Sequence, residues 1–279
     1  MVKWWCEKRS WRQFWVGVGL AIATTVLVVM IGLPKLAAQP SSFDLLSQSS
    51  PSTPNLPPPR IHPLPISLAQ WQAKDNREDY FAQIESTPLG YLVWSKFPIK
   101  VYLEQPKNLQ DNSASNLRFQ QWVEAVREAI AEWNIYLPLT EVAELKLADI
   151  AIARSSPTRV IKLNRETGLY DLGRATTART SYKFYLQEDN PPILSHRMEI
   201  QIDPSLSQQS ILAAARHELG HALGIWGHSR QQTDALYFSQ VRDSPSISSR
   251  DINTLKKIYQ QPTRLGWAII GEQQTGNRQ

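Results

Sequence analysis

The most regular pattern of apolar and polar positions lies between Leu117 and Trp133. Apolar side chains recur there at spacings of three and four residues, which places them along one face of an α-helix. The positions are Leu117, Phe119, Trp122, Val123, Val126, Ile130 and Trp133. We therefore predict a long amphipathic helix whose apolar face belongs to the core.

Alternating apolar and polar positions predict strands before and after this helix. Residues 98–103 alternate as a half-buried strand does. Further strands are predicted at 137–145, 148–152, 182–186 and 198–202. Two more helical stretches follow, and Ser248 with Asp251 forms a predicted capping box at the start of the last one, which ends at Tyr259. This order of elements predicts an α+β domain in which helices pack on a mixed sheet.

An apolar stretch without periodicity occupies residues 14–34. Its 21 residues carry no charge, and a helix of this length crosses about 30 Å of hydrocarbon. Residues 1–13 hold four basic side chains and one acidic side chain, which predicts a cytoplasmic N-terminus and an exported remainder. We expect an uncleaved membrane anchor; cleavage after Ala38 is the alternative, and it would make the protein secreted.

The rest of the chain divides by composition into four parts. Pro and Ser dominate the stretch that follows the apolar run, which is typical of a semi-rigid spacer. The predicted parts are a spacer over 35–66, a weakly helical pre-domain segment over 67–89, a compact domain over 90–262 and a C-terminal tail over 263–279.

Composition narrows the chemistry of any site. The chain of 279 residues has a formal net charge of +5, of which residues 1–13 supply three, so the other 266 carry only +2. This small charge argues against a nucleic-acid-binding domain. The single cysteine, Cys6, can form neither an intrachain disulfide nor a multi-cysteine zinc site. Any metal must be held by histidines and carboxylates.

The candidate chemistry is concentrated in residues 217–228, which read His-Glu-Leu-Gly-His-Ala-Leu-Gly-Ile-Trp-Gly-His and hold three of the five histidines of the chain. The Ala-rich stretch before them favours a helix. On that helix His217 and His221 lie one turn apart on one face, so both imidazoles can reach one ion. Glu218 is then placed beside the metal.

The third ligand depends on how the chain turns after the helix. Gly224 can end the helix in the left-handed conformation, and His228 follows four residues later, where a returning chain offers a third nitrogen. Gly227 supplies a second permissive backbone site for this turn. The rival third ligand is Asp234, because zinc also accepts carboxylates. Three protein ligands leave a fourth position for water, as in catalytic zinc sites.

This pattern resembles the zinc motif of the metzincin peptidases, and more specifically of the matrixins, over roughly residues 95–262. The shared features are His217-Glu218-x-x-His221-x-x-Gly224, Ser229 directly after His228, and Asp234-Ala235-Leu236-Tyr237 in place of the Met-turn. The resemblance implies a twisted, mostly parallel sheet with two packed helices, the active-site helix, and a small C-terminal subdomain with one helix.

The chain departs from the matrixin pattern at three points. Three residues rather than two separate Gly224 from His228, and Leu236 replaces the methionine of the Met-turn. No cysteine-containing pro-segment precedes the domain. A second, structural zinc site is not evident either, because His196 stands alone beside a predicted strand, and we interpret it as a structural histidine.

The resemblance implies a zinc-dependent endopeptidase acting on extracytoplasmic proteins or peptides, with one catalytic Zn²⁺. Glu218 would be the general base. By resemblance Tyr237 lines a substrate pocket, and an extended substrate adds to the edge strand that carries Tyr182 and Phe184. The alternative is a catalytically silent zinc- and peptide-binding module tethered to the membrane. The sequence does not indicate the oligomeric state.

Overall fold

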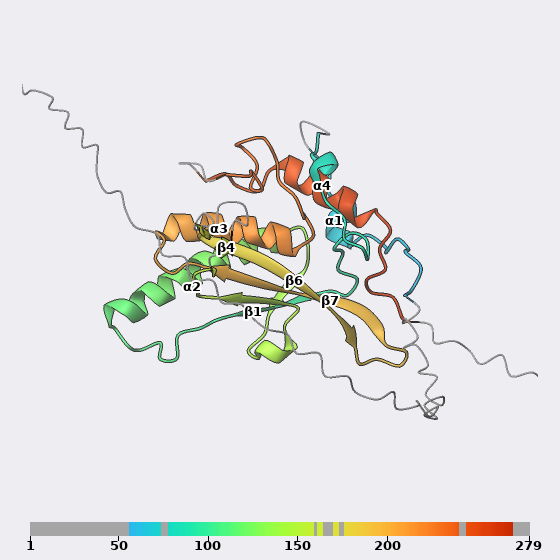
Figure 1. Cartoon of the computed structure of the whole chain (residues 1–279). Coiled ribbons are helices and arrows are strands. Elements are labelled where there is room, and N and C mark those ends of the chain that lie inside the picture. Colours follow the sequence, from blue (N-terminus) through green and yellow to red (C-terminus); the bar gives the residue numbers. More distant parts are fainter. Residues whose placement is uncertain are drawn as a thin grey trace, which may run out of the picture. The chain divides into compact units, whose positions relative to one another are not determined.

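The computed structural model describes residues 56–73, 78–158, 161–163, 170–172, 176–239 and 244–269 (Figure 1). All of them belong to one compact unit, Ser52–Gln279. The predicted cytoplasmic segment 1–13 and membrane segment 14–34 lie outside the described residues, as does most of the predicted spacer. Among the helices that the structure does describe, none has both the length and the apolar character needed to cross a membrane.

The core of the domain is a five-stranded sheet with the order β2-β1-β3-β7-β6. Parallel pairing joins β2 to β1, β1 to β3 and β3 to β7, whereas β6 and β7 are antiparallel. The predicted mixed α+β class is thus confirmed, with β6 at one edge. The strands are β1 (Ile99–Leu103), β2 (Leu139–Glu141), β3 (Ile150–Ala153), β6 (Ala178–Gln187) and β7 (Ile193–Ile202). A separate antiparallel pair consists of β4 (Ile161–Leu163) and β5 (Tyr170–Leu172).

The predicted strands are found, but their lengths differ. The stretch 137–145 contributes only the three residues of β2, and a 3-10 turn, η2 (Leu145–Leu147), follows. Pairing of β2 with β1 ends at Glu141, so the later leucines have no sheet to join and Leu145 is 54% exposed. In contrast, β6 and β7 pair along ten residues each. The two strands form one hairpin, so each continues for as long as the other offers backbone hydrogen-bond partners.

Two helices cover one face of the sheet, α2 (Ala114–Asn134) and α3 (Gln208–Ala222). The apolar face of α2 is in the core as predicted, except at Leu117, which is 43% exposed. The two helices contact each other through Trp133, whose indole N–H donates to the Arg216 carbonyl at 2.8 Å. The Arg216 guanidinium also pairs with Glu132 on α2 at 2.5 Å. These contacts fix α3 against α2 at Arg216, the residue directly before the first motif histidine, His217.

The last helix, α4 (Ser249–Tyr259), begins with the predicted capping box. The Asp251 backbone N–H donates to the Ser248 hydroxyl at 3.1 Å, and the Ser248 N–H donates to the Asp251 carboxylate at 2.8 Å. The short helix α1 (Ile66–Gln70) lies near α4 (Figure 1), and the Lys256 ammonium donates to the Trp71 carbonyl at 2.9 Å.

Residues before and after the predicted domain belong to its packed structure. Arg60 and Thr263 exchange backbone hydrogen bonds of 3.0 and 2.9 Å. The His62 ring donates to the Leu265 carbonyl at 2.8 Å and stacks on Trp267 with centroids 4.2 Å apart. The ordered contacts therefore begin within the stretch that composition predicts as a spacer, and they continue beyond residue 262.

Candidate metal centre

Helix α3 carries the first part of the motif and ends where the sequence predicts. Its N-cap Ser207 accepts from the Ser210 N–H at 3.2 Å. The helix ends at Ala222, and Gly224 follows with φ of +125°. A Cβ atom at Gly224 would also lie 2.5 Å from the Leu92 carbonyl oxygen, so both conformation and space require glycine at this turn.

The turn brings three histidines together. Ligand atoms of His217, His221 and His228 all lie within 4.8 Å of one another. The Nε2 atoms of His217 and His221 are 3.1 Å apart. A tetrahedral zinc ion with Zn–N distances of about 2.0–2.1 Å would separate two ligand nitrogens by about 3.3 Å. The three side chains are therefore close enough to bind one metal ion.

In two of the rings, a hydrogen bond at Nδ1 determines that Nε2 is the nitrogen with the free lone pair facing this centre. The His217 Nδ1–H donates to the Ala235 carbonyl at 2.8 Å, and the His221 Nδ1–H donates to the Ile225 carbonyl at 2.7 Å. A neutral ring that donates from Nδ1 carries a lone pair at Nε2. Two such lone pairs face each other at 3.1 Å, which is repulsive unless a cation lies between them. The donor set thus fits a metal ion.

Burial keeps these rings neutral. Desolvation lowers the pKa of His217 to about 4, with a further contribution from the nearby His221 ring. Desolvation also lowers the pKa of His221 to about 4 and lowers that of His228, where the Glu85 charge acts in the opposite direction. Because zinc binds unprotonated imidazole, these shifts prepare the rings to act as ligands near neutral pH.

Glu218 lies next to His217 on the same helix and is buried, with 8% exposure. Burial raises the pKa of its carboxyl group, while hydrogen bonds from Thr180 act in the opposite direction. The Thr180 hydroxyl, on the edge strand β6, donates to Oε2 of Glu218 at 2.6 Å. No local pattern in the sequence relates Thr180 to a residue 38 positions later, so this contact could not be predicted from the sequence.

Asp234, the rival third ligand, points elsewhere. It is fully buried and accepts hydrogen bonds from Ser229 and from Ser248, the latter at 2.7 Å. The Arg250 guanidinium pairs with the same carboxylate at 3.1 Å. Asp234 therefore holds the loop after His228 together and is not among the residues that converge with His217 and His221.

The turn at residues 234–237 lies directly against α3. Leu236, the Met-turn equivalent, is fully buried, and a Cβ atom at Gly220 would lie 2.5 Å from one of its methyl groups. The Asp251 carboxylate accepts from the Ala235 N–H at 2.9 Å, and the Ala235 carbonyl accepts from His217. Asp251, predicted only as a helix cap, also accepts from the Leu236 N–H at 3.4 Å and so holds the backbone on both sides of Ala235, whose carbonyl orients the His217 ring.

The extra residue before His228 is accommodated by pairing with the pre-domain segment. Ile84 forms an antiparallel bridge with Gly227, and the Glu85 N–H donates to the Trp226 carbonyl at 2.9 Å. Gly227, predicted as a second permissive backbone site, is not among the glycines with a positive φ. Glycine is needed instead because a Cβ atom there would lie 2.2 Å from the Gln83 carbonyl oxygen.

No protein-family model matches this chain, and no curated protein is similar to it. The resemblance to matrixins therefore remains a prediction from the sequence motif.

The predicted substrate-contacting aromatics lie at different distances from the centre. The Tyr182 ring packs edge-on against Trp226 at 5.0 Å, and Trp226 lies 5.8 Å from the His221 ring. The Phe184 ring contacts Tyr182, with centroids 5.1 Å apart, and reaches His221 only through Tyr182 and Trp226. Tyr237 is half-buried and packs on Phe238 at 4.6 Å.

His196 is separate from the metal centre. It is buried on β7 beside Trp94, with ring centroids 3.9 Å apart. Desolvation lowers its pKa to about 3, so the ring is neutral. This environment agrees with the interpretation of His196 as a structural residue.

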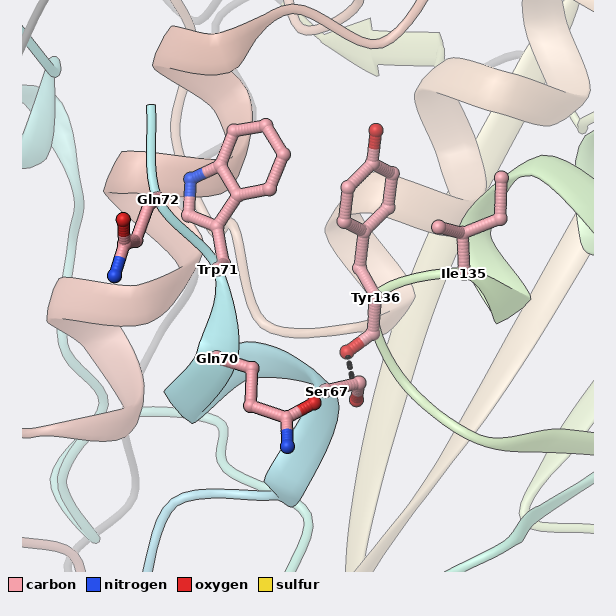
Figure 2. Close-up of a pocket in the computed structure, with 6 residues that line it drawn as sticks. All are labelled: Ser67, Gln70, Trp71, Gln72, Ile135 and Tyr136. Carbon is pink, nitrogen blue, oxygen red and sulfur yellow. Dashed lines mark hydrogen bonds between the residues drawn. The ribbon is translucent and has the colours of Figure 1, made fainter. Parts of the chain in front are cut away.

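A groove lies between α1 and the end of α2 (Figure 2). Within it the Ser67 hydroxyl donates to the Tyr136 carbonyl at 2.6 Å, and the Trp71 ring meets the Tyr136 ring edge-on at 5.5 Å. Its lining contains no histidine, cysteine or carboxylate, so it offers no group for metal chemistry. The lining residues are Ser67, Gln70, Trp71, Gln72, Ile135 and Tyr136.

Proposed function

We propose that this chain is a zinc-dependent endopeptidase with a matrixin-like catalytic domain. The observation that carries the proposal is a buried carboxylate, Glu218, beside three converging histidines whose number leaves a metal coordination position for water. A closed structural zinc site would need a fourth protein ligand, and the histidine group found among the described residues has three members.

The histidines and Glu218 have different tasks in this reaction. Zinc held by His217, His221 and His228 would supply Lewis-acid chemistry, polarising the scissile carbonyl and activating a water molecule. Glu218 accepts the proton of the attacking water and delivers it to the leaving amine. The hydrogen bonds from Thr180 favour the ionised carboxylate that can accept this proton.

The position of β6 supports a peptide substrate. This strand is at the edge of the sheet and contacts Glu218 through Thr180. An extended peptide can add to such an edge by backbone hydrogen bonds. Tyr182, Phe184 and Trp226 form an aromatic cluster between this strand and His221, which suits apolar side chains of a substrate.

The N-terminal sequence supports an exported location. The uncharged stretch 14–34 would anchor the protein with residues 1–13 in the cytoplasm, and the metal centre would then act on proteins or peptides outside that membrane.

The proposed function is tested by peptide hydrolysis with the full chain and its Glu218→Ala variant. We expect the wild type to cleave a denatured protein substrate and to lose this activity to a chelator. Glu218→Ala should lose about 100-fold or more of the turnover while it retains about one equivalent of zinc, because the carboxylate serves the water and not the metal.

Two outcomes would contradict the proposal in different ways. Wild-type turnover in Glu218→Ala would show that the mechanism is wrong. A wild-type chain that binds zinc but cleaves none of a broad peptide library would favour the silent zinc- and peptide-binding module instead.

A further inference from the structure

We propose that Thr180 is a positioning residue for the Glu218 carboxylate. The inference rests on the proposed function, because it concerns how the general base of that reaction is oriented. It starts from one contact between the edge strand and the helix that carries the metal ligands. The Thr180 hydroxyl lies 2.6 Å from Oε2 of Glu218 and 3.0 Å from the Glu218 carbonyl oxygen.

The hydroxyl has one proton and two acceptors within reach, and the carboxylate is the closer one. A hydrogen bond to a charged acceptor is also the stronger of the two. Among the described residues, no other side chain donates to the Glu218 carboxylate. The Thr180 hydroxyl is therefore the side-chain donor that orients this carboxylate, and the Thr180 backbone also hydrogen-bonds to it.

The rigidity of the two elements makes this contact effective. Thr180 is paired with Ile200 in the long β6–β7 hairpin, and Glu218 is in the last two turns of α3. A glutamate side chain has three rotatable bonds, and fixing them costs conformational entropy. The Thr180 hydroxyl selects one orientation before substrate arrives. A general base displaced by about 1 Å can lose roughly 100-fold in rate.

The strand itself gives no reason for a hydroxyl at this position. Valine has the same shape as threonine and is equally favoured in strands. Position 180 is half-buried and faces the helix, where a methyl group in place of the hydroxyl would meet two oxygens of Glu218 without donating to either. The hydroxyl is thus explained by its acceptor, Glu218.

The test compares Thr180→Val and Thr180→Ser in the full chain, with zinc affinity, thermal stability, kcat and KM measured for each. Thr180→Val should lower kcat by about 10- to 100-fold, the range of substitutions that orient a catalytic group indirectly. KM and zinc affinity should stay within about twofold of the wild type. Thr180→Ser keeps the hydroxyl and should recover most of kcat. Thr140→Val, on β2 at the opposite edge of the sheet, is the matched control.

Four results would overturn the inference. Wild-type kcat in Thr180→Val would show that the hydroxyl does not position the base. A loss that Thr180→Ser does not recover, or a parallel loss of zinc affinity, would show that position 180 supports the fold or the ligands instead. If the wild-type chain itself cleaves nothing, the proposed function fails and the inference fails with it; an active wild type beside an unaffected Thr180→Val contradicts only the inference.

Discussion

At the scale of single residues, the centre depends on which nitrogen of each histidine carries the proton. The Nδ1–H groups of His217 and His221 donate to the backbone carbonyls of Ala235 and Ile225, respectively. The two Nε2 lone pairs are therefore directed at a common point, which His228 also approaches. Side chains that merely shared a helix face would not be constrained in this way.

His228 and Asp234 should differ in what their removal costs. We expect His228→Ala to weaken zinc binding by roughly 100-fold or more, because it removes a ligand. Asp234→Ala should keep zinc affinity near that of the wild type but lower the free energy of unfolding by about 1–3 kcal/mol, because buried Ser229 and half-buried Ser248 lose their acceptor. Chelator competition and urea unfolding measure the two effects. A severe loss of zinc affinity only in Asp234→Ala would identify Asp234 as the ligand.

His196 should make stability depend on pH. Its pKa is about 3 in the folded protein and about 6.5 when unfolded, so the unfolded state binds the extra proton between these values. The contribution of neutral His196 to the free energy of unfolding is complete above about pH 6.5. It is lost as the pH falls from there, at up to about 1.4 kcal/mol per pH unit. His196→Phe should show a correspondingly shallower loss in urea unfolding between pH 7 and 4.5. Parallel pH profiles of the two proteins would contradict this assignment.

At the scale of elements, the metal centre combines segments that the sequence places in different regions. Helix α3 supplies His217 and His221, the returning chain supplies His228, and the pre-domain residues 83–85 pair with that returning chain. A further contact joins the same segment to α4, where the Tyr80 hydroxyl donates to the Asp251 carboxylate at 2.5 Å. The segment before residue 90 is thus part of the framework of the site.

Gly227→Ala tests this framework. The added methyl group would meet the Gln83 carbonyl oxygen, so the pairing with the pre-domain segment must shift. We expect a loss of about 1–3 kcal/mol in unfolding free energy and about tenfold weaker zinc binding, measured by thermal unfolding and chelator competition. Gln83→Ala changes only the exposed side chain and keeps the carbonyl, so it should behave as the wild type. Wild-type zinc affinity in Gly227→Ala would show that the segment does not support His228.

At the scale of the whole molecule, the packed unit is larger than the sequence suggests. Arg60 and His62, near the start of the described residues, contact residues 263–267 near their end. These contacts join the two segments into the same packed unit. The stretch available as a spacer after the apolar run is correspondingly shorter than composition indicates.

The proposed export predicts where an external protease cuts. Protease added to intact cells should cleave within residues 40–55, because the basic residues before the apolar run place the following chain outside. Residues 57–66 should resist cleavage, because the backbone at Pro57 and Arg60 is hydrogen-bonded to residues 263 and 264 at the end of the domain. Mapping the fragments by mass spectrometry distinguishes the two stretches, and detergent-lysed cells are the control. Cleavage that appears only after lysis would contradict the topology.

Local patterns determined much of the architecture. The periodicity of α2, the alternation of β1, the capping box of α4 and the left-handed turn at Gly224 are all present as predicted. The relation between His217 and His221 also follows from sequence, since a spacing of four on any helix places two side chains on one face. These features depend on neighbours within one or two turns of chain.

Only the tertiary structure decided how the remaining parts of the site are held. The contact of Thr180 with Glu218 spans 38 positions, and the pairing of Ile84 with Gly227 joins segments still further apart. The reason for glycine at position 227 was also hidden from the sequence, since the carbonyl that excludes a side chain there belongs to Gln83. Such contacts arise when whole elements pack on a common core, and no periodicity within one segment encodes which distant segment will lie against it.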